Sequence, residues 1–143
     1  MSKKINLLET GNMLLAAQKI VLCCHVSPDG DTLGSALGLA RLLEQKGKEV
    51  TVFVDDDINK SLNFIPGIEK VQRPEAGVIV EADLFVVVDA SSFDRVGICN
   101  EVVKAPVLLN IDHHISNTEF ADYLYLDAEA AAAGEIMCDL FEA

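Results

Sequence analysis

Side chains that can bind a divalent metal ion occur at three places in the sequence, each directly after an apolar run. In chain order these are His25, Asp29 and Asp31, then Asp89, and finally Asp112, His113 and His114. Aspartate oxygens and histidine nitrogens together suit Mn²⁺ or a similar divalent ion better than Ca²⁺, which prefers oxygen ligands alone. The two carboxylates of the first group are two residues apart, so one loop can serve two neighbouring ions. The residue types therefore predict a metal site with more than one ion.

A site of this kind has a characteristic chemistry. Two divalent ions about 4 Å apart can clamp a phosphoryl group, lower the pKa of a water molecule and stabilise the leaving oxygen. Each residue also has a simpler interpretation by itself, because an aspartate after a strand commonly caps a turn and a lone histidine commonly packs at the surface. Several aspartates packed together repel one another unless cations lie between them. Their joint occurrence after successive apolar runs favours a pair of metal ions.

The elements that position these residues alternate between strands and helices. Short apolar runs predict buried strands at 20–24, 50–54, 84–88, 107–111 and 123–126. Helical spacing of apolar residues predicts helices over 6–19, 32–45 and 130–141. This alternation implies an α/β fold, a three-layer αβα arrangement with a mostly parallel, Rossmann-like doubly wound sheet. The carboxyl ends of parallel strands meet at one edge, so all three groups of candidate ligands converge there.

Smaller features are expected between these elements. They are a helix cap from Asp31 or Thr32, a helix end at Gly47, a short helix near 62–65 and a strand near 71 or 78. The acidic stretch 55–57 has no histidine beside it, and we expect it to be a solvated loop.

The composition is that of an acidic globular domain. The chain has 143 residues, half of them hydrophobic, and a formal net charge of −12, which disfavours binding of long nucleic acids through a basic face. No apolar run reaches the roughly 18 residues of a membrane span, and the N-terminus does not resemble a signal peptide, so we expect a cytoplasmic protein without membrane contact. The four cysteines form no C-x-x-C pair, and we expect buried, reduced thiols rather than a zinc site.

Three segments around the candidate ligands resemble the ordered motifs of the DHH phosphoesterase superfamily. They are residues 25–35 (HVSPDGDTLGS), 88–97 (VDASSFDRVG) and 112–117 (DHHISN). Three motifs in the same order are far more specific than one. The chain is most similar to the branch of oligoribonucleases and phosphoadenosine phosphate phosphatases. The resemblance implies a hydrolase of phosphate esters, in short oligonucleotides or phosphoadenosine phosphate, which uses a water molecule activated by two metal ions.

The same resemblance implies how the ligands divide between two ions, which we expect to be Mn²⁺, with Mg²⁺ or Co²⁺ as alternatives. His25, Asp29 and Asp89 would hold one ion. Asp31, Asp89 and His113 would hold the other, so that Asp89 bridges both.

Other residues of the motifs acquire roles by the same resemblance. His114 would face the substrate phosphate and help to bind it or to transfer a proton to the leaving group. Asp112 would orient a histidine rather than bind metal, as carboxylates outside the ligand set often do. Arg95 would orient the phosphate or form a structural ion pair with a nearby acid. Asn117 would shape the loop after the third motif.

Two departures from the family pattern bear on completeness. The family supplies a further aspartate for the second ion, in an Asp-Thr-Gly segment after the third motif, and this segment does not occur here. The family also has a C-terminal substrate-binding domain, which we do not find in this sequence. We therefore expect residues 1–143 to be a DHH domain that is incomplete at its C-terminal end, with a weaker second metal site. An apolar surface exposed in this way would favour self-association, for example as a homodimer.

Several other functions are compatible with these motifs. Within the superfamily, a pyrophosphatase, a cyclic-dinucleotide phosphodiesterase and a single-strand exonuclease are alternatives. A receiver-like signalling module also places an aspartate after its third strand, but it does not need His25, His113 and His114. An inactive domain that has kept the site is a third alternative. Metal binding separates the receiver, which binds one Mg²⁺ weakly, from a site that prefers Mn²⁺ and holds up to two ions.

Overall fold

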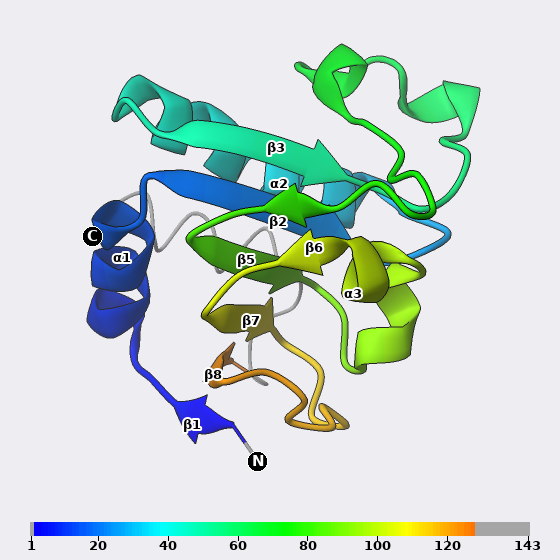
Figure 1. The fold of residues 1–143 in the computed structure, drawn as a ribbon. Helices are drawn as coiled ribbons and strands as arrows, with labels where there is room; N and C mark the ends of the chain where they lie inside the picture. The colour runs from blue at the N-terminus through cyan, green and yellow to red at the C-terminus, as the bar shows by residue number, and fades with distance from the viewer. Residues whose placement is uncertain (1, 128–143) are drawn as a thin grey trace.

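The computed structural model describes residues 2–127, which form a six-stranded sheet with further elements on both faces (Figure 1). All pairings in this sheet are parallel, and the strand order is β1-β8-β7-β5-β2-β3. The strands are β1 Lys3–Lys4, β2 Lys19–Cys24, β3 Glu49–Phe53, β5 Leu84–Val88, β7 Leu108–Asp112 and β8 Tyr123–Leu126. The predicted α/β fold with a parallel sheet is confirmed.

Helices and a small second sheet cover the two faces of the large sheet. The helices are α1 Leu7–Ala16, α2 Gly30–Gln45 and α3 Cys99–Val102, and the 3-10 helices are η1 Lys60–Leu62, η2 Ile68–Lys70 and η3 Phe93–Val96. The second sheet pairs β4 Val80–Glu81 with β6 Val103–Lys104. One face is covered by α1 and α2, and the other by α3, η3 and the β4–β6 pair (Figure 1). The arrangement has the predicted three layers, one of which consists of short elements.

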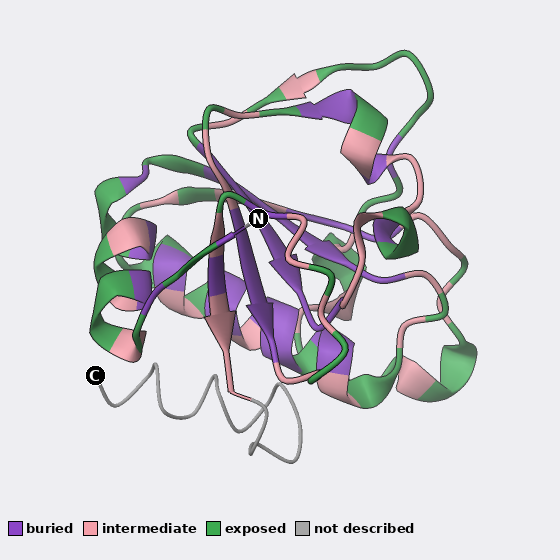
Figure 2. Cartoon of the chain, turned by 90° about the horizontal axis from the view of Figure 1, so that it is seen from below, coloured by how far each residue is buried: buried purple, intermediate pink, exposed green. Residues whose placement is uncertain are grey.

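Alternate residues of the central strands contribute to two separate hydrophobic cores. In β2, Ile20 and Leu22 belong to the core under α1 and α2, whereas Val21 and Cys23 belong to the core on the other face. All four are fully buried. Figure 2 shows central strands of the sheet as mainly buried, as expected for strands covered on both sides. Burying a Val, Leu or Ile side chain contributes roughly 1.5–3 kcal/mol. The two cores therefore fix the strand ends that carry the candidate ligands.

The strand order places the candidate ligands at a switch point of the sheet. From β2 the chain passes through α2 to β3 on one side, and it later enters β5 on the other side of β2. The connections that leave β2 and β5 therefore diverge, and ligands bind at such points in open α/β sheets. Because β7 lies beside β5, all three groups of candidate ligands reach the same edge.

The start of α2 differs from the prediction. The helix begins at Gly30, and its cap is Asp29 rather than Asp31 or Thr32. Asp29 Oδ1 accepts a hydrogen bond of 2.8 Å from the Thr32 backbone N–H. A helix cap has an extended backbone, and Asp29 meets this condition with φ −106° and ψ 180°. The helix therefore starts earlier than the apolar spacing indicated. At the other end, Gly47 has φ +82°, as expected just past a helix.

The shortest elements could not be predicted from periodicity. Two to four residues make up β1, β6 and α3, which is too few to show a pattern. Between 58 and 82, the short helix expected near 62–65 has its nearest counterpart in η1. The strand expected near 71 or 78 has its nearest counterparts in the single bridge from Phe53 to Gln72 and in β4. The helix expected over 130–141 lies outside the described residues.

The cysteines that the structure describes match the prediction. Cys23, Cys24 and Cys99 are buried free thiols. Burial raises the pKa of Cys23 and Cys24 well above the ordinary value, which keeps both side chains protonated and unreactive. Cys138 lies outside the described residues.

Candidate metal centre

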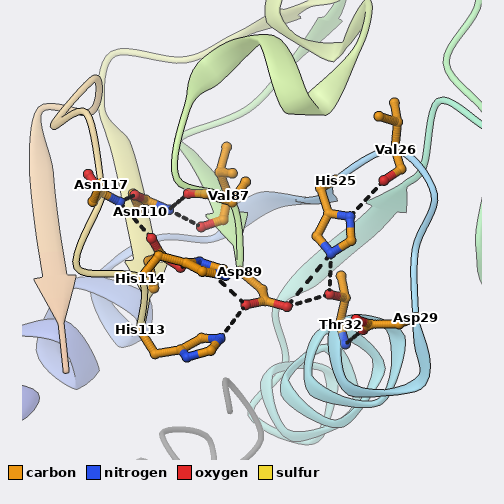
Figure 3. Close-up of polar contacts among 12 residues, drawn as sticks. His25, Val26, Asp29, Thr32, Val87, Asp89, Asn110, His113, His114 and Asn117 are labelled. Carbon is orange, nitrogen blue, oxygen red and sulfur yellow. Dashed lines mark hydrogen bonds and ion pairs between the residues drawn. The ribbon is translucent and has the colours of Figure 1, made fainter. Parts of the chain in front are cut away.

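Asp89 occupies the middle of the site, as the first residue after β5 (Figure 3). It is 5% exposed, and its backbone has φ +62°, a left-handed conformation that is uncommon for residues other than glycine. Such a conformation costs on the order of 1–3 kcal/mol and persists only where surrounding contacts enforce it. The backbone N–H of Asp89 donates to the Ile111 carbonyl over 2.9 Å, which ties this turn to β7. The turn places the carboxylate between the loops that follow β2 and β7.

One carboxylate oxygen of Asp89 faces the loop after β2. The Thr32 hydroxyl donates to Asp89 Oδ2 over 2.6 Å, and His25 Nε2 lies 3.7 Å from the same oxygen (Figure 3). His25 Nδ1 donates to the Val26 carbonyl over 2.7 Å, so Nε2 is the nitrogen that meets Thr32 and Asp89. The nearby Asp89 carboxylate raises the pKa of His25, although burial opposes this. His25 therefore presents Nε2 where a proton or a metal ion can bind beside Asp89.

The other carboxylate oxygen faces the two histidines after β7. His113 Nε2 lies 2.9 Å from Asp89 Oδ1, and His114 Nδ1 lies 4.0 Å from it. Asp112 is fully buried, and its Oδ1 accepts a hydrogen bond of 2.5 Å from His114 Nδ1. Because Asp112 engages Nδ1, the ring nitrogen of His114 that remains for a ligand is Nε2, on a side chain that is 41% exposed. Asp112 thus makes the histidine contact predicted for it.

The donor atoms fit divalent metal ions. Ligand atoms lie within 4.8 Å of one another in two groups, one of His25, Asp29 and Asp89 and the other of Asp89, Asp112, His113 and His114. Among the described residues, the buried Oδ1 of Asp89 accepts no hydrogen bond of good geometry, despite its short distance to His113. A buried carboxylate oxygen without a hydrogen bond is costly unless a cation compensates it. Nitrogen and oxygen ligands in this combination suit Mn²⁺ and related ions.

The charge of Asp89 is set by its neighbours. Burial acts to raise its pKa, but the nearby His25, the hydrogen bond from Thr32 and the neighbouring His113 and His114 outweigh it, so the pKa is lowered. The carboxylate is therefore ionised at neutral pH, and both ligand groups share its negative charge.

Asp31 is the one predicted metal ligand outside both groups. It sits in the first turn of α2 and belongs to neither set of close ligand atoms within residues 2–127. Its predicted place beside Asp89 and His113 at the second ion stays a prediction.

Arg95 lies close to the first ligand group, on η3. Its backbone carbonyl accepts a hydrogen bond of 2.6 Å from the Val26 N–H. Asp89 raises the pKa of His25, and the positive charge of Arg95 acts to lower it, so the guanidinium is within electrostatic reach of the site. In the part of the chain that the structure describes, the exposed Arg95 side chain forms no ion pair.

Two buried polar residues of the site were not predicted as site residues. Thr32, which was expected only as a cap, is 0% exposed and contacts both Asp89 and His25 through its hydroxyl. Asn110 is also 0% exposed, and it is the one polar residue in the apolar run 107–111. A polar side chain within such an apolar run is the signal that could have identified Asn110. No comparable signal distinguishes Thr32 from an ordinary residue of a first helical turn.

The acidic stretch after β3 joins loops and lies outside both ligand groups among the described residues. Asp55 Oδ2 accepts from the Ile98 N–H over 2.8 Å, and Asp56 accepts from the Ser27 N–H over 2.8 Å. The expected solvation holds for Asp57, whose side chain is 98% exposed, but not for Asp55, at 17%. Burial of Asp55 follows from its hydrogen bond to the neighbouring loop.

Residues 19–143 match the N-terminal domain of the DHH family. The chain belongs to the DHH family. A bifunctional oligoribonuclease and PAP phosphatase NrnA from Thermus thermophilus is 35% identical to it, over 86% of this chain and 36% of that protein. A protein of the same description from Mycoplasma pneumoniae is 32% identical, over 96% of this chain and 44% of that protein.

The similar proteins also include a pyrophosphatase, and a solved structure confirms the fold. A probable manganese-dependent inorganic pyrophosphatase from Enterococcus faecalis is 28% identical, over 78% of this chain and 36% of that protein. The crystal structure of an exopolyphosphatase-related protein from Bacteroides fragilis matches with a TM-score of 0.84 and 28% identity, over 94% of this chain and 42% of that chain. The DHH domain thus spans less than half the length of the relatives that it matches.

Proposed function

We propose that this DHH domain is the metal-binding part of a phosphoesterase, which hydrolyses phosphate esters with two divalent ions. The observation that carries the proposal is the position of Asp89, whose two oxygens face different ligand groups. Oδ2 lies beside His25, and Oδ1 lies beside His113 (Figure 3). A carboxylate with a nitrogen ligand beside each oxygen is suited to bridge two metal ions.

The ligands divide between the ions as follows in this proposal. His25, Asp29 and Asp89 hold the first ion, which the close approach of their ligand atoms supports. Asp89 and His113 hold the second, with Asp31 as the further ligand that the family resemblance implies. Mn²⁺ is the ion that we propose, because the mixed ligand set suits it and one relative is described as manganese-dependent. Mg²⁺ and Co²⁺ are the alternatives.

The remaining side chains of the site act on the substrate. Two divalent ions bound here would lower the pKa of a water molecule and offset the charge of the phosphate. His114, held at Nδ1 by Asp112, contacts the phosphate through Nε2 and delivers a proton to the leaving oxygen. Asp112 contributes by orienting His114. Arg95, within electrostatic reach of His25, binds phosphate oxygens.

Short oligoribonucleotides and phosphoadenosine phosphate are the proposed substrates. The support is similarity, because the relatives with 35% and 32% identity are both described as oligoribonuclease and PAP phosphatase. Inorganic pyrophosphate serves as the comparison substrate, since a pyrophosphatase also matches.

Location and assembly are further proposals. No helix within residues 2–127 is long and apolar enough to cross a bilayer. The cytoplasmic location and the homodimer stay predictions from the sequence. Cell fractionation and analytical ultracentrifugation are the measurements that test them.

The test of the proposed function is hydrolysis by the purified chain with Mn²⁺. We expect release of AMP from 5′-phosphorylated diadenylate RNA and of phosphate from phosphoadenosine phosphate, both abolished by a chelator and by Asp89→Asn. Asp83→Asn is the matched control, because Asp83 lies at the other end of β5 and should leave turnover unchanged. Faster hydrolysis of pyrophosphate than of either nucleotide would overturn the substrate class. Absence of Mn²⁺-dependent hydrolysis from a chain that also binds no Mn²⁺ would overturn the function, and Mn²⁺ binding without hydrolysis would favour the inactive domain.

A further inference from the structure

Asn110 holds the backbone on both sides of Asp89 from the neighbouring strand. It pairs with Val87 in the register of β5 and β7, and its side chain is 0% exposed. Asn110 Nδ2 donates to the Val87 carbonyl over 3.0 Å and to the Ala90 carbonyl over 3.2 Å (Figure 3). These two carbonyls bracket Asp89, whose backbone is left-handed. Both N–H hydrogens of the Asn110 amide are therefore used on the strained turn that carries the central carboxylate.

Asn117 connects this turn to the two histidines after β7. Its Nδ2 donates to Asn110 Oδ1 over 2.7 Å and to Asp112 Oδ2 over 2.8 Å. The other oxygen of Asp112 accepts from His114 Nδ1. An unbroken series of hydrogen bonds thus runs from the Asp89 turn through two asparagines to His114.

The orientation of both amides follows from their partners. The carboxylate of Asp112 and the carbonyls of Val87 and Ala90 can only accept hydrogen bonds, so amide nitrogens must face them. Asn117 Oδ1 in turn accepts from the Glu119 backbone N–H over 2.7 Å. The direction of the series is therefore determined by chemistry, and each amide has one arrangement.

A second link joins the same two loops outside this series. The Ser91 carbonyl accepts from the Thr118 backbone N–H over 2.8 Å and from the Thr118 hydroxyl over 3.0 Å. The loops after β5 and β7 are thus anchored independently of the asparagines. Loss of an asparagine should therefore alter the alignment of the site more than it separates the loops.

We infer that Asn110 and Asn117 are positioning residues of the metal centre, which fix the Asp89 carboxylate relative to His113 and His114. This role rests on the proposed function, because the side chains that they align are its proposed metal ligands. A left-handed turn relaxes when the contacts that enforce it are removed. The relaxation would move Asp89 Oδ1 away from His113, from which it now lies 2.9 Å.

Mn²⁺ binding to the full 143-residue chain distinguishes positioning from a contribution to stability alone. Asn110→Ala removes the donors to the turn, and Asn117→Ala, at a partly buried side chain, breaks the link to Asp112. Leu109→Ala is the matched control, because it empties a fully buried position of the same strand and removes no side-chain hydrogen bond. Calorimetry gives affinity and stoichiometry, electron paramagnetic resonance reports coupling between neighbouring Mn²⁺ ions, and thermal unfolding without metal compares stability.

We expect both asparagine variants to bind Mn²⁺ on the order of 10- to 100-fold more weakly than wild type, with loss of the coupled signal. Leu109→Ala should be less stable and yet bind with wild-type affinity and coupling. If Asn110→Ala does not fold, the Mn²⁺ affinity of Asn117→Ala alone tests the positioning role. Wild-type binding in the asparagine variants, or a weakening that Leu109→Ala shares, would overturn the positioning role while the proposed function stands. A wild-type chain that binds no Mn²⁺ would overturn both.

Discussion

An aspartate lies at each end of β5, and the two carboxylates have different kinds of partner. Asp83, just before the strand, is exposed, and its Oδ2 accepts from the backbone N–H groups of Lys19 over 2.9 Å and Gln18 over 3.1 Å. Asp89, just after the strand, is buried among side chains from the loops after β2 and β7. Backbone amides cannot bind a metal, so Asp83 only joins β2 to β5. The histidine partners of Asp89 can bind one.

Both carboxyl groups have a lowered pKa, but for different reasons. Hydrogen bonds from the Lys19 and Gln18 backbone lower the pKa of Asp83. Burial acts to raise the pKa of Asp89, and the nearby His25 together with the hydrogen bond from Thr32 outweighs it. The same direction of shift thus accompanies a structural contact at one end of a strand and a candidate binding site at the other. The chemical nature of the partners, and not the shift, distinguishes the two.

The largest effect on metal binding is expected at Asp89. Asparagine keeps the shape of the side chain and tolerates a left-handed backbone, but it removes the charge that both ligand groups share. Asp89→Asn should weaken Mn²⁺ binding by roughly 100-fold or more, about 2.7 kcal/mol, as measured by calorimetric titration. Asp83→Asn should bind like wild type. An Asp89→Asn protein that keeps both ions at near wild-type affinity would contradict a shared carboxylate.

A variant at Gly97 shows whether damage to the fold can imitate loss of the site. Gly97 has φ +62° and ψ −139°, and a Cβ there would collide with the Asp55 carboxylate that accepts from Ile98. Gly97→Ala should lower the free energy of unfolding by about 3 kcal/mol, measured with urea, through backbone strain and a lost hydrogen bond. Gly11→Ala is the control, because a Cβ in the middle of α1 meets nothing within 4 Å and should stabilise by about 0.5–1 kcal/mol.

Mn²⁺ affinity provides a second measurement on the Gly97→Ala variant. Gly97→Ala should bind Mn²⁺ with the affinity of wild type while it remains folded. A large loss of affinity would mean that the stability of this loop, and not the partners of Asp89, controls the site.

A variant at Thr32 should affect one side of Asp89 more than the other. Thr32→Val keeps the shape of the side chain but removes the hydroxyl that donates to Asp89 Oδ2 and contacts His25 Nε2. Without metal, the buried groups left unpaired should cost about 2 kcal/mol of stability. The affinity for the Mn²⁺ ion on the His25 side should fall, and the affinity for the ion on the His113 side should change little. Thr32→Ser retains the hydroxyl as the control, and equal behaviour of the two variants in urea unfolding and Mn²⁺ titration would refute the role of the hydroxyl.

The smallest effect is expected at Asp83, and its sign depends on pH. Because the folded-state pKa is lowered, the contribution of Asp83 to stability is present above the unfolded pKa of about 3.9 and is lost as the pH falls through the folded value. Wild type should therefore be more stable than Asp83→Asn at neutral pH, and the two urea midpoints should converge in acid. A gap that is constant across this range would show that the charge is irrelevant.

Local patterns in the sequence predicted one side of the site better than the other. His25 and Asp29 share one loop after an apolar run, so their proximity follows from chain connectivity. The contacts of Asn110 with Val87 and Ala90 depend on the register between β5 and β7, which no local pattern encodes.

The start of α2 shows a second limit of local reasoning. The sequence favoured Asp31 or Thr32 as the cap, and it offered Asp29 and Asp31 equally as ligands. In the structure Asp29 is the cap and lies in the ligand group of His25, and Asp31 is in the first turn of the helix. The left-handed backbone of Asp89 was likewise unpredictable, since tertiary contacts and not the residue type enforce it.

The central claim is that Asp89 bridges two metal ions. Anomalous diffraction at the manganese edge, from crystals of the chain grown with Mn²⁺, tests it most directly. A bridging Asp89 predicts two anomalous peaks, one beside Oδ2 near His25 and one beside Oδ1 near His113. A single peak, or peaks that do not share Asp89, would contradict it.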